Sequence, residues 1–572
     1  MKTFLRVMGL AFALNYLVIS PRCGWAEEQS ATRTGGKTET QTADSAGMTV
    51  GEVVLEEIVV TATGDVKMRD TPASISVITA KDIEARGIKN IGEALAKVAG
   101  VFDDGSSSYY FSLRGTRSSS SGGPLVLVDG VRQDVGMLGY NYFETIPVAE
   151  IERIEILRSP GSTVFGADSA RGIISIITKK ADKKKEGLKG SVSASAGSWS
   201  TFDESATLSG VMDRWDLLFS GSRTDTDGYL HNEQERSAAR VKAGYSFSDQ
   251  ARLGLNLSYK DNHWQTVRGK NRYALENDRE ADEFQASPTA KLTSYNETDQ
   301  EASSLGLDFG YKAQDLFFDI LAAATRVDEE HDARYATYTS PKSVYRDDRN
   351  QDRYNLDVSG GYRFGQGFFQ YTPKLGFNLE TTALEQRRDY YNDPVGKAAS
   401  KRKADIDFDQ EKAGLFFQNQ LLFGERWELN AGARWDEVGY EVENRNGNRV
   451  DTRSSNTSWS VAPAYHWNDR ATSYVSVGKS YWYPVAYYYQ EAMQYMNPEN
   501  LPEDLKPESC LVYEIGHKHS FSRALNVNLA LFWMDYRDKF AVFYDSDQSY
   551  AGYKNTGDSE HRAWNWKSTA SP

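Results

Sequence analysis

Residues 251–260 read ARLGLNLSYK, and apolar residues alternate with polar ones along the whole stretch. Successive side chains of a β-strand point to opposite faces, so this alternation predicts a strand with one apolar and one polar face. The pattern returns in five further stretches, at 305–311, 354–364, 427–435, 459–467 and 525–533. Such strands predict either a soluble β-sandwich or propeller, or a transmembrane β-barrel whose apolar face meets lipid.

Aromatic residues at the ends of these stretches favour the barrel. Tyr259, Trp427, Trp435, Trp459 and Trp467 stand there, and Trp and Tyr rings suit the boundary between lipid and water. The opposite face is polar and suits a wet lumen. We therefore expect residues 187–572 to form an antiparallel transmembrane β-barrel in contact with outer-membrane lipid.

The first 26 residues have the features of a secretory signal. Lys2 and Arg6 precede an apolar run from Met8 to Ser20, and small residues stand at Gly24 and Ala26. An uncleaved anchor is the alternative. The segment has basic residues and no acidic ones, so its removal makes the formal net charge of −14 more negative. An acidic chain of this kind is not expected to bind nucleic acid.

Residues 27–64 read as a flexible periplasmic tail, and residues 65–182 as a small α+β domain. The tail is polar except for the patch VVLEEIVVTAT at Val53–Thr63, so it lacks the apolar content of a packed core. In the domain, Ser74–Ile78 and Leu125–Val128 have strand composition, and helices are expected at 80–86 and 91–98.

Long charged and aromatic segments separate the predicted strands, at 267–285, 329–349 and 385–403. Long external loops are typical of outer-membrane barrels. The last segment combines cations with aromatic rings that could hold an anionic aromatic ligand, at Arg387, Arg388, Tyr390 and Tyr391. A loop that simply faces water is the alternative.

An ordered series of motifs in residues 56–180 resembles the start of the TonB-dependent outer-membrane receptors. The motifs are EEIVVTA at 56–62, RDTP at 69–72, SISVI at 74–78, LRGT at 113–116, VLVDGV at 126–131, IERIEILRSP at 151–160 and GIISIIT at 172–178. Pieces of 478–518 resemble the family's barrel region. Each motif is short, but their order and spacing are specific. One departure is Ala167–Arg171, where the family is usually richer in glycine.

The resemblance implies an α+β plug domain inside an antiparallel transmembrane β-barrel of about 22 strands, in the outer membrane of a Gram-negative bacterium. It implies a TonB box that would add a strand to the periplasmic partner TonB, at Glu57, Ile58, Val59, Val60, Thr61 and Ala62. Taken alone, this patch could be an ordinary first strand. It also implies structural roles in the plug, with charges paired to each other and to barrel carboxylates, for Arg114, Gly115, Asp129, Gly130, Arg153, Glu155 and Arg158.

The resemblance implies a transported cargo, most simply a ferric siderophore, and no permanently bound cofactor. Ligand contacts are expected at the plug tips 106–110 and 118–123, first at Tyr109 and Tyr110, and in the barrel at Tyr487 and Tyr488. Haem receptors of the family carry a ligating His in the segment that corresponds to 485–496, which has none here. Tyr can ligate haem iron, so haem and cobalamin stay as alternatives.

The resemblance ends before the chain does. Residues 562–572 (RAWNWKSTASP) lose the alternation, where family members continue with further strands. Residues 187–572 look several strands short of about 22, so we expect an incomplete barrel, with a smaller closed barrel as the competing account. If the barrel is incomplete, the chain would be a truncated receptor that no longer transports.

Other classes of function find little support. The sequence has no GxxxxGK[ST] loop, no HExxH and no cysteine-based metal cluster, so we expect neither an enzyme nor a metal site. His517 and His519 share a strand face without a third ligand. Cys23 would leave with the signal and Cys510 would stand alone, so no intramolecular disulfide is expected. A passive porin would lack both plug and box.

Overall fold

The computed structural model describes most of the chain from Thr71 to Ala570, preceded by residues 58–61 and 64–67. Within that span the description has gaps at 104–110, 117–122, 135–142, 159–162, 164–165, 183–186, 230–231, 267–282, 288–289, 336–343, 392–398, 404, 490–504, 523–524 and 545–549. The predictions of a signal and a tail in 1–57 lie outside the described residues. So do those for Glu57, Ala62, Tyr109, Tyr110 and the plug tip 118–122.

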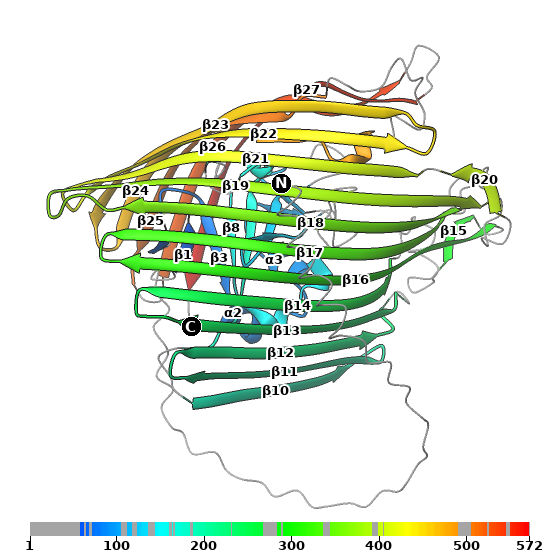
Figure 1. The fold of residues 1–572 in the computed structure, drawn as a ribbon, viewed down its shortest axis with the longest axis horizontal. Coiled ribbons are helices and arrows are strands. Elements are labelled where there is room, and N and C mark those ends of the chain that lie inside the picture. Colours follow the sequence, from blue (N-terminus) through cyan, green and yellow to red (C-terminus); the bar gives the residue numbers. More distant parts are fainter. Residues whose placement is uncertain are drawn as a thin grey trace, which may run out of the picture. The chain divides into compact units, whose positions relative to one another are not determined.

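Most of the chain forms one antiparallel sheet of 18 strands that follow each other in chain order (Figure 1). The strands are β10 (Gly187–Gly197), β11 (Thr201–Met212), β12 (Trp215–Thr226), β13 (Gln234–Ser246), β14 (Ala251–Gln265), β15 (Glu283–Ser287), β16 (Ala290–Ala313), β17 (Leu316–Tyr335), β18 (Val344–Tyr362), β19 (Phe369–Tyr391), β20 (Ala399–Lys403), β21 (Ile406–Phe423), β22 (Trp427–Asn444), β23 (Arg449–Asn468), β24 (Ala471–Trp482), β25 (Glu508–Ser520), β26 (Leu525–Tyr544) and β27 (Tyr550–Ala570). The short strands β15 and β20 are bypassed by direct β14–β16 and β19–β21 pairing, so 16 long strands build the wall.

Five of the six alternating stretches fall wholly in these strands, and the stretch 354–364 runs two residues past the end of β18, so the predicted fold class is confirmed. In the β14–β16 pair, Leu255 stands opposite Leu307, and both belong to the exposed apolar side of the sheet. Aromatic pairs stand at the end of that band near the short turns. The ring centroids of Trp215 and Tyr245 are 4.8 Å apart, and those of Trp427 and Tyr465 are 4.7 Å apart. Cross-strand aromatic pairs of this kind stabilise a sheet and suit a lipid boundary.

The two outermost strands of the sheet, β10 and β27, each pair with a single neighbour among the described residues. The expectation of fewer than about 22 strands is confirmed, and the sheet is not closed. Although the alternation is lost after His561, β27 continues to Ala570 along β26. Among the described residues, no helix is long and apolar enough to cross a membrane.

The domain before the sheet is the predicted α+β plug. Its central sheet has the order β3-β8-β9-β6-β7, with β3 (Ile75–Thr79), β6 (Leu125–Val128), β7 (Val131–Arg132), β8 (Ile151–Leu157) and β9 (Ile173–Thr178). The remaining elements are α2 (Ala80–Ala85), α3 (Ile91–Ala96), the pair β4 (Val101–Asp103) and β5 (Phe111–Leu113), and the 3₁₀ turns η1 (Phe143–Thr145), η2 (Val148–Glu150) and η3 (Ser169–Arg171). The small pair β1 (Ile58–Thr61) and β2 (Gly64–Lys67) precedes them.

Local chemistry explains the plug helices. The Thr79 side chain accepts a hydrogen bond from the Asp82 backbone N–H, and Asp82 accepts one from the Thr79 N–H. This capping box satisfies two N–H groups that a helix start otherwise leaves free. Asn90 caps α3 through the Glu93 N–H. Ile91 and other apolar residues then pack between the helices and the sheet.

The predicted Asp-Gly turn joins β6 to β7. Asp129 and Gly130 have φ values of 49° and 84°, the left-handed conformation that a tight hairpin turn needs. A Cβ on Gly130 would lie 2.9 Å from Leu321 Cδ2 of the wall. Both the turn and the close approach therefore require glycine here.

A fully buried ion pair fastens the plug to the wall. The Arg114 guanidinium contacts Glu514 of β25, and neither side chain has exposed surface. The guanidinium also lies 3.9 Å from the centre of the Phe532 ring. Removing one partner of such a pair leaves the other charge buried without compensation, which destabilises a protein by about 3–5 kcal/mol.

We therefore expect Arg114→Met to lower the free energy of unfolding of the plug by about 3–5 kcal/mol. The measurement is urea unfolding of the detergent-solubilised protein, followed by protease cleavage within the plug. Arg562→Met is the matched control, because Arg562 pairs with Glu560 on the exposed surface and should contribute no more than about 1 kcal/mol. Equal effects of the two variants would contradict this account.

Candidate functional site

One strand of the wall, β25, holds the plug at three levels. Its buried charged residues on the plug side are Glu508, Glu514 and Lys518. Lys518 Nζ donates to the Thr71 carbonyl (2.6 Å), and Glu514 accepts from the Ser74 N–H (2.9 Å), both at the start of the plug. At the other end of the strand, Glu508 accepts from Arg171 (2.8 Å). A single strand thus contacts the beginning and the end of the plug.

The predicted plug residues Arg114, Arg158, Arg153 and Glu155 lie in the plug sheet and its flanks. Arg158 donates to the Ser76 hydroxyl (3.0 Å) and the Ala99 carbonyl (2.7 Å). Burial lowers the pKa of Arg158 to about 10, and neighbouring Arg114 acts in the same direction. Arg153 donates to Glu155 on the same strand (2.8 Å).

Asp129 connects the β6–β7 turn to both the plug and the wall. It accepts from the Thr178 N–H (3.0 Å) and hydroxyl (2.6 Å), and it lies 2.9 Å from Lys242 Nζ of β13. Burial would raise the pKa of Asp129, but Lys242 and Arg240 outweigh burial and lower it. Of the two glycines predicted with these residues, Gly115 follows Arg114 with φ 71° and Gly130 completes the turn.

Asp168 connects the plug to two parts of the wall, a role that the sequence did not reveal. Its carboxylate accepts from Arg132 of the plug (2.6 Å), from Lys412 of β21 (2.9 Å) and from the Tyr483 N–H beyond β24 (2.8 Å). Burial would raise its pKa, but Lys412 and Arg132 outweigh burial and lower the pKa to about 2. Its φ of 75° marks a strained backbone of the kind found at functional positions.

Arg171 is the second residue that the sequence reading missed. It is 1% exposed, pairs with Glu508 and stacks 3.6 Å from the centre of the Trp482 ring. The signal was the departure from the glycine-rich family pattern at Ala167–Arg171. A long side chain there reaches out of the plug into the wall, which glycine could not do.

An aromatic cluster covers this end of the plug. Tyr488 packs against Tyr553 (4.4 Å) and Phe540 (4.7 Å) between ring centroids, and it is fully buried. Tyr487 is partly buried at the edge of the same cluster. Tyr487 and Tyr488, the two predicted ligand contacts of the barrel, thus lie in a short helical turn at 486–489, and Ala170 of the plug belongs to the same cluster.

The predicted candidates on β19 divide between the two faces of the sheet. Arg388 donates to both carboxylate oxygens of Asp347 (2.5 and 2.7 Å) and lies 4.0 Å from the centre of the Tyr345 ring. Tyr390 is buried on the same inner face, and its ring centre is 6.0 Å from that of Tyr345. Arg387 and Tyr391 alternate with these residues, so they belong to the other face; Arg387 pairs there with Asp407 (2.7 Å).

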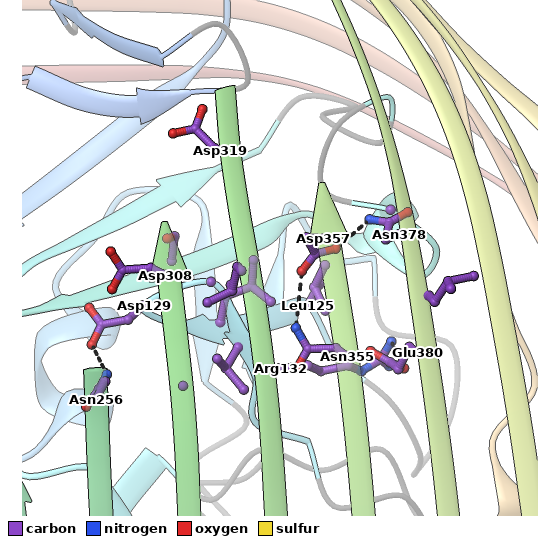
Figure 2. Close-up of a pocket in the computed structure, with 18 of the residues that line it drawn as sticks. Leu125, Asp129, Arg132, Asn256, Asp308, Asp319, Asn355, Asp357, Asn378 and Glu380 are labelled. Carbon is purple, nitrogen blue, oxygen red and sulfur yellow. Dashed lines mark hydrogen bonds and ion pairs between the residues drawn. The ribbon is translucent and has the colours of Figure 1, made fainter. Parts of the chain in front are cut away.

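A cavity of about 650 Å³ separates the β6–β7 hairpin from the wall (Figure 2). Acidic and basic side chains line it together, among them Asp357, Glu380, Lys412 and Arg434. Asp357 accepts from Asn378 (3.0 Å) and Asn355 (3.2 Å). The lining charges are joined into the plug–wall network, so this side of the plug is held by electrostatic contacts.

The ion pairs between the plug and the wall differ in burial. Against β18–β25, the ion pairs Arg171–Glu508 and Asp134–Arg353 have side-chain exposures of 9% or less. Against β11, Lys89 pairs with Asp203 at exposures of 57% and 28%. Exposed pairs contribute about 0–1 kcal/mol, whereas breaking a buried pair costs about 3–5 kcal/mol.

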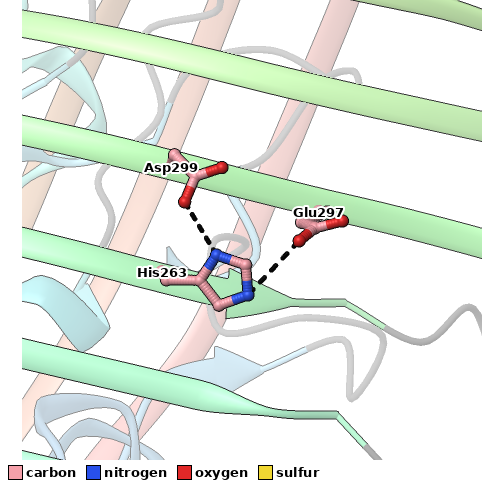
Figure 3. A group of neighbouring side chains, drawn as sticks. All are labelled: His263, Glu297 and Asp299. Carbon is pink, nitrogen blue, oxygen red and sulfur yellow. Dashed lines mark hydrogen bonds and ion pairs between the residues drawn. The ribbon is translucent and has the colours of Figure 1, made fainter.

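One group of side chains in the described part has the composition of a metal site. His263 lies 2.7 Å from Asp299 and 3.4 Å from Glu297, and both carboxylates belong to β16 (Figure 3). The carboxylates engage the two different ring nitrogens, so the imidazole is bridged between acids rather than turned toward one common point. The predicted pair His517 and His519 has ring centroids 5.8 Å apart.

The predicted TonB box begins with a paired strand. Ile58, Val59, Val60 and Thr61 form β1, which pairs with β2 from Ile58–Lys67 to Thr61–Gly64. The pairing occupies one edge of the box, so a partner strand would either take the free edge or replace β2.

Two family models match this chain. The TonB-dependent Receptor Plug Domain matches residues 67–173, and the TonB dependent receptor-like, beta-barrel family matches residues 189–565. The iron-regulated outer membrane virulence protein of Vibrio cholerae is 38% identical over 141 residues, which are 23% of this chain and 21% of that protein. The match thus spans about a fifth of that relative. The vitamin B12 transporter BtuB of Vibrio vulnificus is 23% identical over 86% of this chain and 72% of its own length.

Solved structures share the fold. The unliganded ferric citrate transporter FecA has a TM-score of 0.73 at 16% identity, over 90% of this chain and 77% of that one. The closed form of the ferric-catecholate import receptor Fiu from E. coli K12 has a TM-score of 0.69 at 17% identity, over 91% and 80%. The family is one of transport receptors. With plug and barrel both matched in order, the chain belongs to the TonB-dependent receptors of the Gram-negative outer membrane.

Proposed function

We propose that this receptor binds a ferric siderophore at its outer face and imports it into the periplasm when TonB displaces the plug. The observation that carries the proposal is the attachment of the plug to β25. Lys518 and Glu514 hold the plug start next to the predicted box, and Glu508 holds Arg171 below the aromatic cluster. A pull on the box and a ligand on the cluster would therefore act on the same strand.

The periplasmic step is a strand exchange. β1 and β2 share four residue pairs, so the hairpin is short and few contacts hold it. TonB would pair with the box backbone, as partners do in β-augmentation. Tension on residues 62–70 then reaches Thr71 first, and through Thr71 it acts on the contact to Lys518.

Support for an iron complex as cargo comes from the inner face of β18 and β19. Arg388, Tyr345 and Tyr390 place a cation and aromatic rings at the outer end of that face, a combination that suits an anionic aromatic chelate. The structural neighbours include a ferric citrate transporter, a ferric-catecholate import receptor and a ferric preacinetobactin receptor. The cargo would either displace Asp347 from Arg388 or bind Arg388 together with Asp347.

Cobalamin is the second candidate, because the BtuB relative matches 86% of this chain. Haem is the third, with Tyr487 as a ligand of the type that haem iron accepts. A receptor that binds but does not transport would also fit a sheet whose outer edges, at β10 and β27, find no partner among the residues that the structure describes. A heat-dependent shift in a detergent gel would show that the wall closes in the membrane.

The TonB step predicts different effects for two proline variants of the hairpin. Val59→Pro removes a backbone N–H from the box and should abolish uptake while cargo binding stays unchanged, because proline cannot complete a strand ladder. Val66→Pro breaks the same hairpin from β2 and should leave uptake intact. The measurement is energy-dependent uptake of iron-55 chelates by whole cells. Uptake by Val59→Pro at the wild-type rate would remove the box from the mechanism.

The cargo proposal predicts a selective loss of affinity at Arg388. Arg388→Ala should weaken binding of a ferric chelate about 10- to 100-fold, since hydrogen bonds to charged groups contribute about 1.5–3 kcal/mol. Arg387→Ala is the matched control on the opposite face and should bind like the wild type. Binding is measured on isolated outer membranes with the iron-55 citrate, trihydroxamate and tricatecholate chelates, and with labelled cobalamin. Saturable binding of cobalamin alone would replace the siderophore proposal.

A further inference from the structure

The side of the plug that faces β10–β13 differs from the side that faces β18–β26. A second cavity, of about 670 Å³, lies there between the plug and the wall. Its size is within the usual range of about 300–1,000 Å³ for small-molecule sites. The plug contributes the end of α2 and the turn at η2, and all the lining residues belong to the described part of the chain.

Small hydroxyl side chains of β10–β12 form most of the wall of this second cavity, here called the hydroxyl carpet, with Asp203 among them and Arg236 of β13 beside them. Register places the hydroxyl residues of β10, β11 and β12 that line it on one face, because Ser193 stands opposite Ser205, and Ser205 opposite Ser222. Thr207 and Thr224 continue the surface. Short hydroxyl side chains can exchange hydrogen bonds with water or with a polar solute, and they hold nothing in place by length or charge.

On β10 and β11, the plug is joined to this carpet by exposed contacts. Lys89 Nζ reaches Ser195 Oγ and Asp203 (both 3.0 Å) on an exposed surface. On the opposite side, Arg114, Asp168 and Arg171 make buried contacts to β21 and β25. Because exposed pairs separate at far lower free energy than buried ones, a force on the plug would separate it from β10 and β11 before it breaks the buried pairs, which include Glu150–Arg240 on β13.

A buried ion pair lies at the level of Thr207, the lining residue of β11 that is nearest its short turn. Glu150 of η2 accepts from Arg240 Nε (2.8 Å) and from the Ser220 hydroxyl (3.1 Å). Ser220 and Arg240 lie nearer the short turns than Ser222 and Ser205 do, and short turns mark the periplasmic end of such barrels. The cavity thus runs along the wall toward the periplasm and ends at the level of this pair.

From these contacts we infer that cargo crosses the receptor along the hydroxyl carpet of β10–β12, and that the plug stays attached to β25 while the opposite side opens. This inference rests on the proposed uptake function and adds its route. The cavity beside the β6–β7 hairpin, which charged contacts span, stays closed during transport.

The test places a large side chain in each of the two cavities in turn. Ser205→Trp narrows the second cavity, beside β10–β12, and Asn355→Trp is the matched control in the cavity of Figure 2. Uptake of the iron-55 citrate, trihydroxamate and tricatecholate chelates is measured for each, together with binding to outer membranes. We expect Ser205→Trp to lower uptake roughly tenfold with unchanged binding, and Asn355→Trp to transport like the wild type. Equal uptake by the two variants, or a loss in Asn355→Trp alone, would overturn the route.

A second variant tests the route without the risk that Ser205→Trp fails to fold. Ser193→Cys changes one atom and should transport normally until N-ethylmaleimide enlarges the side chain, when uptake should fall. Asn355→Cys is the control, and the native Cys510 is buried in the wall. Normal uptake after complete labelling of Ser193→Cys would also overturn the route. If the wild type takes up none of the three chelates, the proposed function fails. If the wild type transports and both Ser205→Trp and labelled Ser193→Cys transport equally well, only the route is refuted.

Discussion

A charge that leaves water must find a partner, and this constraint organises the interior of the receptor. The plug carries arginines into a space where they are fully buried, and the wall supplies the acids that make this tolerable. Arg114 with Glu514 and Arg171 with Glu508 have exposures of at most 1%. Pairs of this kind add little net stability compared with apolar packing, but they strongly penalise any other arrangement. They therefore fix where the plug lies more than how stable it is.

Much of the fold follows from short-range patterns. The alternation at 251–260 gave the strand and its apolar face, because a one-residue slip would turn every leucine into the lumen. The Thr79–Asp82 cap and the Asp129–Gly130 turn are likewise local, since each depends on residues within three positions. Such features can be predicted from one sequence because the chain itself brings the partners together.

The site could be predicted only in part, for the opposite reason. Arg171 meets a glutamate 337 positions away, and Arg114 meets one 400 positions away, so no window of sequence shows either pair. Asp168 looked like one residue in a loop, yet it joins three elements. Arg387 and Arg388 looked equivalent until the strand register placed them on different faces. The sequence named the residue types, and only the packing showed which of them share a space.

The strands of the wall differ in length, and this has a consequence at the cell surface. β10 to β13 have 11 to 13 residues, whereas β16 to β19 have 19 to 24. At about 3.4 Å per residue, the taller strands extend about 20–40 Å further along their own axes (Figure 1). The wall is therefore tall at β16–β19 and low at β10–β13. A large particle that reaches the tall side, such as an antibody, would find a much longer surface there than on the low side.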